Sequence, residues 1–166
     1  MRNHSPWRVP LAVALTGFAA LLVQSAGIYL SVQKLQEAGA VITTEVVRLP
    51  MLAAGLAALA CFVVTGWKLV RPLTRRQALC SAGIAVAYSY LVLALEQLGQ
   101  RAPGLFLLVS LSQLLYLPLT AQVNITSLAY QALPDFPGGL WAYALLTPLL
   151  PLCYLPFARG ERENAG

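Results

Sequence analysis

Glu96 is the acidic residue that lies closest to the interior of a long apolar stretch of this chain. An ionisable group inside a membrane-spanning segment is by default a candidate for function, because burying its charge in lipid is costly. Its position near the end of the stretch also allows two simpler roles. The carboxylate could reach the lipid headgroups, or it could pair with Arg101, five residues further on. We expect the headgroup contact and retain Glu96 as a candidate ligand-binding residue.

Four polar residues share a helical spacing in a later apolar stretch: Gln113, Tyr116, Thr120 and Asn124. Positions i, i+3, i+7 and i+11 fall on one face of an α-helix. Hydrocarbon offers these side chains no hydrogen bonds, so the stripe is expected to face other helices. It would then form interhelical hydrogen bonds or line a site for a polar ligand, and both interpretations stay open. Pro118 lies within the stripe and can interrupt it.

Catalytic and metal-binding patterns are mostly missing. His4 is the only histidine and Asp135 the only aspartate, which excludes a paired-aspartate protease and a two-histidine zinc site. Cys61, Cys80 and Cys153 have no CxxC spacing. The chain also has no GxSxG sequence, no P-loop and no dinucleotide fingerprint. We therefore predict no catalytic residue, no metal ligand and no cofactor, and we expect that the protein is not an enzyme.

The composition indicates that these residues are surrounded by lipid and not by water. Of 166 residues, 58% are hydrophobic and only 10% are charged, whereas a soluble domain carries about 25% charged residues. The charges gather between charge-free stretches that are near or above the roughly 20 residues that a helix needs to cross a bilayer. The sequence predicts an all-α, polytopic transmembrane helix bundle that forms one integral membrane domain over residues 1–166. The net charge of +5 sits at the ends of apolar runs, so nucleic acid is not an expected partner.

Five apolar segments are predicted, at about 9–30, 49–70, 77–98, 105–133 and 139–158. The fourth is too long for one straight span and too short for two, and Pro118 should kink it. It is expected to form either a kinked span followed by an interfacial segment or a re-entrant hairpin. The fifth contains Pro148, Pro151 and Pro156 and should be bent or broken. The chain thus has five spans, or four spans and one irregular segment.

The regions around the first connection carry two further expectations. The first apolar segment is longer than the hydrophobic region of most signal peptides, so we expect it to be retained. Part of the connector from Ser31 to Arg48 could form an amphipathic helix in the membrane interface. Pro50 fits the first turn of the following helix, where its missing N–H has no cost.

Four positive charges lie close together between the second and third segments, at Lys68, Arg71, Arg75 and Arg76. The positive-inside rule places this cluster, and with it the N-terminus, in the cytoplasm, where the four side chains contact lipid headgroups. With an even number of crossings, eight basic residues lie on that side of the membrane and three on the other. With five crossings the numbers are six and five, so charge favours an even number. Hydropathy favours five, and the side of the C-terminus stays open.

Small residues suggest how the helices associate. Alanines and a glycine between residues 53 and 60, and the pair Gly83 and Ala87, allow a neighbouring backbone to approach closely. We expect a non-catalytic component of the plasma membrane that assembles with itself or with other membrane proteins. The alternative is a substrate-binding or transport subunit in which Glu96 and the polar stripe line a site for a small molecule. A membrane enzyme is the least favoured alternative.

Overall fold

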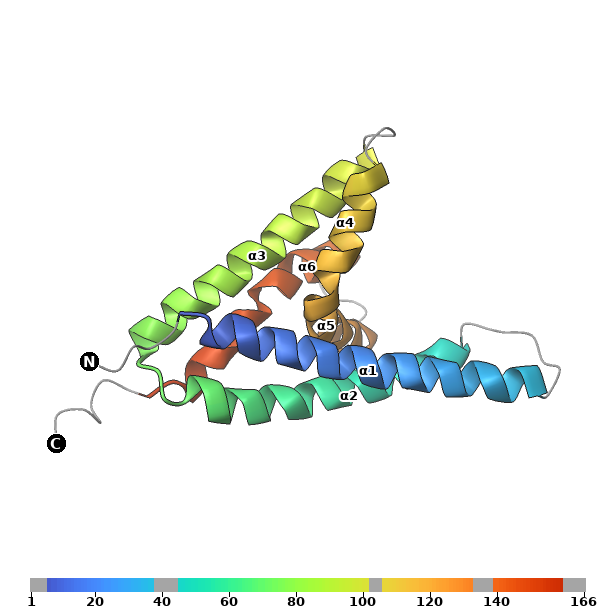
Figure 1. Ribbon diagram of the computed structural model, residues 1–166, viewed down its shortest axis with the longest axis horizontal. Coiled ribbons are helices and arrows are strands. Elements are labelled where there is room, and N and C mark those ends of the chain that lie inside the picture. The colour runs from blue at the N-terminus through green and yellow to red at the C-terminus, as the bar shows by residue number, and fades with distance from the viewer. Residues whose placement is uncertain (1–5, 38–44, 102–105, 133–138, 160–166) are drawn as a thin grey trace.

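The computed structural model describes residues 6–37, 45–101, 106–132 and 139–159, and the elements in these ranges are helical (Figure 1). The α-helices are α1 (Arg8–Glu37), α2 (Glu45–Thr65), α3 (Arg75–Arg101), α4 (Phe106–Tyr116), α5 (Thr120–Ala132) and α6 (Gly139–Leu146). A π-helical turn, η1 (Gly66–Val70), ends α2. Two 3₁₀ segments, η2 (Leu117–Leu119) and η3 (Thr147–Phe157), follow α4 and α6.

Four stretches of helix are long and apolar enough to cross a membrane: Arg8–Glu37, Arg48–Val70, Arg75–Arg101 and Leu107–Ala132. Trp141–Phe157 is apolar but shorter. Large apolar side chains cover much of the outer surface, and Leu22 and Leu107 are 71% and 82% exposed. Water would disfavour such a surface, whereas lipid accommodates it. The prediction of an all-α membrane-spanning bundle is confirmed, and the chain is a multi-pass integral membrane protein.

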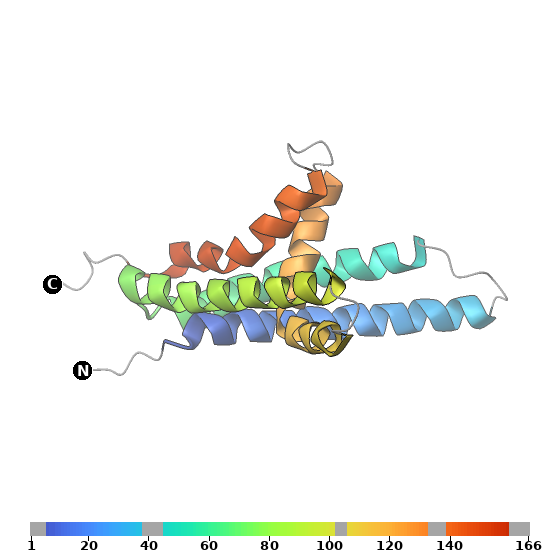
Figure 2. The same ribbon diagram turned by 90° about the horizontal axis from the view of Figure 1, so that it is seen from above.

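The helices form an antiparallel hairpin, followed by segments that lead away from it and return (Figures 1 and 2). Helices α1 and α2 lie side by side and antiparallel, and α3 leaves the end of α2 at a steep angle to this pair. Helix α4 returns from the far end of α3 to the middle of α1, and α5 then turns out of the plane of Figure 1. Helix α6 and η3 lead back along α3, with which η3 packs.

The beginning of α1, the turn between α2 and α3, and the end of η3 meet at one end of the bundle. The backbone N–H of Val9 donates to Ser81 Oγ over 3.0 Å, and the N–H of Arg159 donates to the Leu73 carbonyl over 3.0 Å. An isolated β-bridge also joins Thr74 to Arg159. Both ends of the described chain therefore lie on the same side, which fits an even number of crossings. The segments from α4 to η3 together form the last return.

The connector after the first span differs from the prediction. Residues 31–37 continue α1, and α2 begins at Glu45, so Pro50 lies inside α2 and not in its first turn. A 30-residue helix is about 45 Å long, which exceeds the hydrocarbon core of about 30 Å. The polar residues at the end of α1 can therefore stay helical beyond the lipid. Residues 38–44, the middle of the predicted connector, lie outside the described range.

Prolines change the helix type where breaks were predicted. The α-helix gives way to 3₁₀ geometry around Pro118 and again from Thr147 to Phe157, because proline lacks the N–H that the α-helix requires. The first break packs tightly on α1 at Gly17, where an added Cβ would lie 1.9 Å from the Pro118 carbonyl oxygen. Only glycine leaves room for this contact, which fixes the point at which α5 turns away.

Candidate functional site

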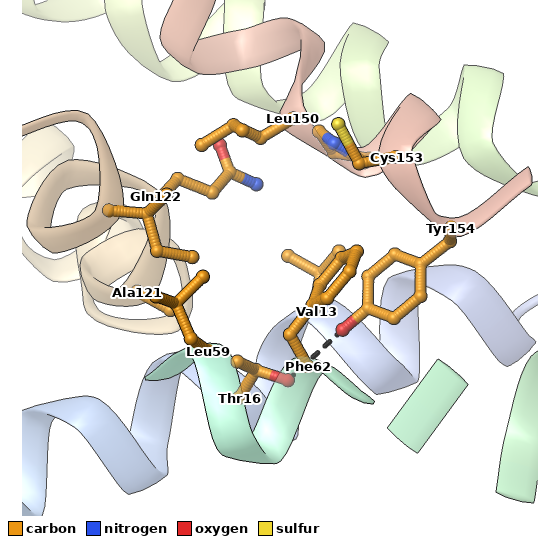
Figure 3. A pocket seen from close by; sticks show the side chains of 11 residues that line it. Val13, Thr16, Leu59, Phe62, Ala121, Gln122, Leu150, Cys153 and Tyr154 are labelled. Carbon is orange, nitrogen blue, oxygen red and sulfur yellow. Dashed lines mark hydrogen bonds between the residues drawn. The ribbon is translucent and has the colours of Figure 1, made fainter. Parts of the chain in front are cut away.

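A cavity of about 220 Å³ lies between α1, α2, α5 and η3 (Figure 3). Its lining is mostly apolar and aromatic and consists of Val13, Thr16, Leu59, Phe62, Ala121, Gln122, Ile125, Leu150, Pro151, Cys153 and Tyr154. Helix α5, which follows η2, crosses the α1–α2 pair instead of running along it (Figure 2). Helices that cross steeply share only a short contact, and the space beside the contact stays open.

Three hydroxyl groups meet at one end of the cavity, from Thr16 on α1, Thr65 on α2 and Tyr154 on η3. The Tyr154 oxygen lies 3.1 Å from Thr16 Oγ1 and 2.9 Å from Thr65 Oγ1, and the two threonine oxygens are 3.3 Å apart. Tyr154 is 2% exposed, and its ring lies against Phe62 with the centroids 4.2 Å apart. This hydroxyl cluster joins three segments that are far apart in the sequence.

Gln122 of α5 lies at the opposite end and is 5% exposed. Its Oε1 lies 3.4 Å from Ser89 Oγ of α3, whose single hydrogen also donates to the Ala85 carbonyl at 2.9 Å. Its Nε2 is buried without a hydrogen-bond partner, and Figure 3 shows this nitrogen directed into the cavity. A buried donor that lacks a partner costs about 1–3 kcal/mol. The chain thus retains an unfavourable group at this position, and a bound molecule could supply the missing partner.

The cavity opens sideways onto the apolar surface of the bundle. Leu59, at its edge, is 42% exposed, and Cys153 is also exposed. The exposed side chains beside the opening are mostly apolar, and lipid accommodates such a surface better than water does.

The structure brings two of the predicted ligand-binding residues together in a different place. Glu96 lies near Tyr116 and accepts a hydrogen bond from Gln100 Nε2 at 3.3 Å. Both residues line a second cavity of about 330 Å³, to which Thr126 and Trp141 also contribute. The hydrogen bond from Gln100 is exposed, and the headgroup contact of Glu96 expected from the sequence stays a prediction.

The other three predicted residues do not share a surface with this pair. Gln113 is exposed on α4, and the Thr120 hydroxyl donates to the carbonyl of Leu117 at 2.8 Å. Asn124 is 2% exposed, and its Nδ2 donates to Gln24 Oε1 of α1 at 3.1 Å. The predicted stripe is divided because η2 breaks the helix between Tyr116 and Thr120. Asn124 therefore forms the interhelical hydrogen bond that was one of the two interpretations.

The predicted basic cluster lies at the end of the bundle where the described chain begins and ends. Lys68, Arg71, Arg75 and Arg76 flank the turn between α2 and α3, and the Arg71 guanidinium stacks over the Trp67 ring at 3.9 Å from its centroid. Arg8 and Arg159 belong to the same end. Arg8 directly precedes Val9, whose N–H binds Ser81, and the Arg159 N–H binds the Leu73 carbonyl. Two acidic residues, Glu37 and Glu96, lie towards the C-terminal ends of α1 and α3, away from this end of the bundle.

Sequence analysis missed the polar residues that line the cavity between α1, α2, α5 and η3, namely Thr16, Gln122 and Tyr154. Each is an isolated polar residue in a charge-free stretch, and that signal indicates only that the side chain faces protein and not lipid. The signal does not distinguish a residue with a partner from one without. Asn124 and Gln122 are two positions apart on α5, yet one is paired across helices and the other is not.

Comparison with protein-family models, with curated proteins and with solved structures finds no match to this chain. A functional conclusion must therefore rest on the site itself. The cavity offers an apolar volume, a satisfied hydroxyl cluster and one unsatisfied amide, which are features suited to binding.

Proposed function

We propose that this chain is a non-catalytic protein of the cell membrane that binds a small, largely apolar molecule in the cavity between α1, α2, α5 and η3. The observation that carries the proposal is the combination of this cavity with the partnerless amide nitrogen of Gln122. Ligand sites are typically apolar hollows with a few polar groups that fix orientation. The cavity fits that description better than the dispersed polar stripe does.

Filling the cavity tests this proposal. In Leu150→Trp an indole would occupy part of the space, because Leu150 lines the cavity. Leu149→Trp is the matched control, since Leu149 is the adjacent residue and does not belong to the lining. Native mass spectrometry after purification in mild detergent should detect a small molecule bound to the wild-type protein and to Leu149→Trp, and lost from Leu150→Trp. Identical small-molecule content in all three proteins would contradict the proposal.

Assembly with itself or with other membrane proteins is a second candidate, supported by the outer face of α3. Gly83 and Ala87 are exposed there, and a Cβ added to Gly83 would meet nothing within 4 Å. On α2, in contrast, Ala54 and Ala58 are fully buried within the chain, whereas Ala53 and Ala60 are exposed. The small-residue pair on α3 is thus available to a helix of another chain.

The exposed Cys80 lies on the same face of α3, three residues before Gly83, and provides a test of self-association. In a variant whose other cysteines are replaced by alanine, oxidation in membranes should produce a Cys80-linked dimer. Gly83→Leu should reduce this dimer because the larger side chain separates the helices. A dimer yield that is unchanged by Gly83→Leu would exclude this face as the contact.

We also propose that the end carrying the basic residues is cytoplasmic, as the positive-inside rule implies. Thr74→Cys marks this end and Glu37→Cys the far end of α1. In an otherwise cysteine-free protein, a membrane-impermeant thiol reagent added to intact cells should label position 37 and not position 74. The opposite pattern would reverse the orientation.

A further inference from the structure

The hydroxyl cluster needs no hydrogen bond from a ligand. Thr16 Oγ1 donates to the Ala12 carbonyl at 2.8 Å, and Thr65 Oγ1 donates to the Cys61 carbonyl at 2.8 Å. Each threonine has a single hydroxyl hydrogen, so both oxygens are left as acceptors for Tyr154. The Tyr154 hydrogen then bonds to one of them. Every hydrogen of the cluster is used inside the protein.

Gln122 is different, because its amide nitrogen carries two hydrogens that find no acceptor in the described protein. The nitrogen faces the cavity, while the amide oxygen faces Ser89. A ligand that brings an acceptor atom to this end would satisfy the amide. A ligand without one would leave the donor buried and would also exclude water from it.

The lining indicates that the ligand is uncharged. Within the described residues, the lining contains no aspartate, glutamate, lysine, arginine or histidine. A charged ligand would lose its hydration without gaining a counter-ion, which is strongly unfavourable in an apolar site.

The volume indicates the size of the ligand. A protein cavity of about 150 Å³ lined by apolar side chains can hold benzene. The present cavity is about 220 Å³, so a bicyclic molecule of roughly ten non-hydrogen atoms is of suitable size.

We propose that the ligand is a neutral, mainly apolar molecule with a carbonyl-type hydrogen-bond acceptor, and that this acceptor binds the Gln122 amide nitrogen. The inference rests on the proposed function, because it assigns a chemical class to the ligand of the same cavity. The apolar body occupies the space between Phe62, Leu150 and Ile125, and the acceptor lies beside α5.

Three probes of similar size test this assignment: indane has no polar atom, 1-indanone adds a carbonyl acceptor, and indole offers an N–H donor. Each is titrated into the delipidated full-length protein in detergent, and binding is measured by the shift of the thermal unfolding midpoint. We expect 1-indanone to bind about tenfold more tightly than indane, which corresponds to one additional hydrogen bond. The carbonyl stretching band of bound 1-indanone should shift to lower frequency than that of 1-indanone in the detergent alone.

Gln122→Leu supplies the mutational test, with Gln122→Met as a second variant of similar length. Either substitution removes the unsatisfied amide, so the unliganded variant should unfold at a higher temperature than the wild type while losing its preference for 1-indanone. Gln131→Leu is the matched control, because Gln131 is an exposed glutamine on the same helix. It should retain the preference and the infrared shift.

The possible outcomes separate the two proposals. Equal binding of indane and 1-indanone, with weaker binding of both to Leu150→Trp, would overturn the acceptor assignment and leave the binding function standing. Preferential binding of indole would also overturn it, because the amide oxygen would then face the cavity. If no probe binds and Leu150→Trp behaves like the wild type, the proposed function itself is wrong.

Discussion

The basic end of the bundle and the cavity each contain a buried polar side chain that contacts a distant segment. The side chain at the basic end has all its hydrogen-bond partners, and the one in the cavity does not. Ser81, fully buried at the basic end, accepts a hydrogen bond from the Val9 N–H and donates one to the Pro6 carbonyl. Gln122 is almost as deeply buried, yet its amide nitrogen has no partner. Complete pairing identifies the first region as structural, and incomplete pairing identifies the second as a candidate site.

The pairing at Ser81 has a clear origin. The first N–H groups of an α-helix have no acceptor within the helix, and Val9 lies in the first turn of α1. A serine side chain from α3 supplies the acceptor and acts as a cap from a distant part of the sequence. Gln122 is the third residue of α5, and its amide oxygen lies beside the Ser89 hydroxyl and not beside a backbone N–H of another helix.

The largest effect is expected for Gly17→Ala, which should damage both regions together. The new Cβ would lie 1.9 Å from the carbonyl oxygen of Pro118, so α1 and η2 must separate and α5 must move with them. Overpacking of this kind should lower the free energy of unfolding by about 3 kcal/mol. The change is measured by denaturant or thermal unfolding in detergent.

Gly83→Ala is the control, because an added Cβ there meets nothing within 4 Å. Alanine favours a helix over glycine by about 1 kcal/mol, so this variant should keep or increase the stability. Equal losses in both variants would show that the close contact between Gly17 and Pro118 is not important.

An intermediate effect is expected for Ser81→Ala. The buried Val9 N–H would lose its acceptor, at a cost of about 2 kcal/mol, and the start of α1 should detach from α3. Hydrogen exchange of the amides near Val9 should become faster, while 1-indanone binding in the cavity stays unchanged. Ser127→Ala, at a partly exposed position on α5, should leave both properties unchanged. A loss of binding in Ser81→Ala would indicate that the two regions are coupled.

The smallest effect is expected for Tyr154→Phe at the other end of the cavity. Thr16 and Thr65 keep their hydrogen bonds to the carbonyls of Ala12 and Cys61, so only the tyrosine hydroxyl contact is lost. The free energy of unfolding should fall by about 1 kcal/mol, and the preference for 1-indanone over indane should remain. If the preference disappears, the carbonyl lies beside the hydroxyl cluster and not beside Gln122.

The sequence predicted much of the fold because its signals are local. Runs of apolar residues require lipid, and Pro118 and Pro148 lie where the α-helix changes to 3₁₀ geometry. The charge count favoured an even number of crossings, which agrees with the contact between Leu73 and Arg159. The predicted position of Pro50 was wrong, since α2 begins at Glu45. Residues 31–37 continue α1, and the interfacial location of the connector stays a prediction because residues 38–44 lie outside the described range.

The candidate site was less predictable, because helical spacing holds only while the helix is continuous. The break at η2 separates Gln113 and Tyr116 from Thr120 and Asn124, so residues with the right spacing do not share a surface. Glu96 and Tyr116 do meet, because α4 returns along α3.

The amino-acid sequence by itself determined that the chain is helical and resides in a membrane, and which end of the bundle carries the positive charge. These properties depend on the transfer of each segment from water to lipid, which composition controls. Tertiary structure alone decided which polar side chains are satisfied. A hydrogen bond depends on the distance between two groups, and residues such as Thr16 and Tyr154, 138 positions apart, are brought together only by folding.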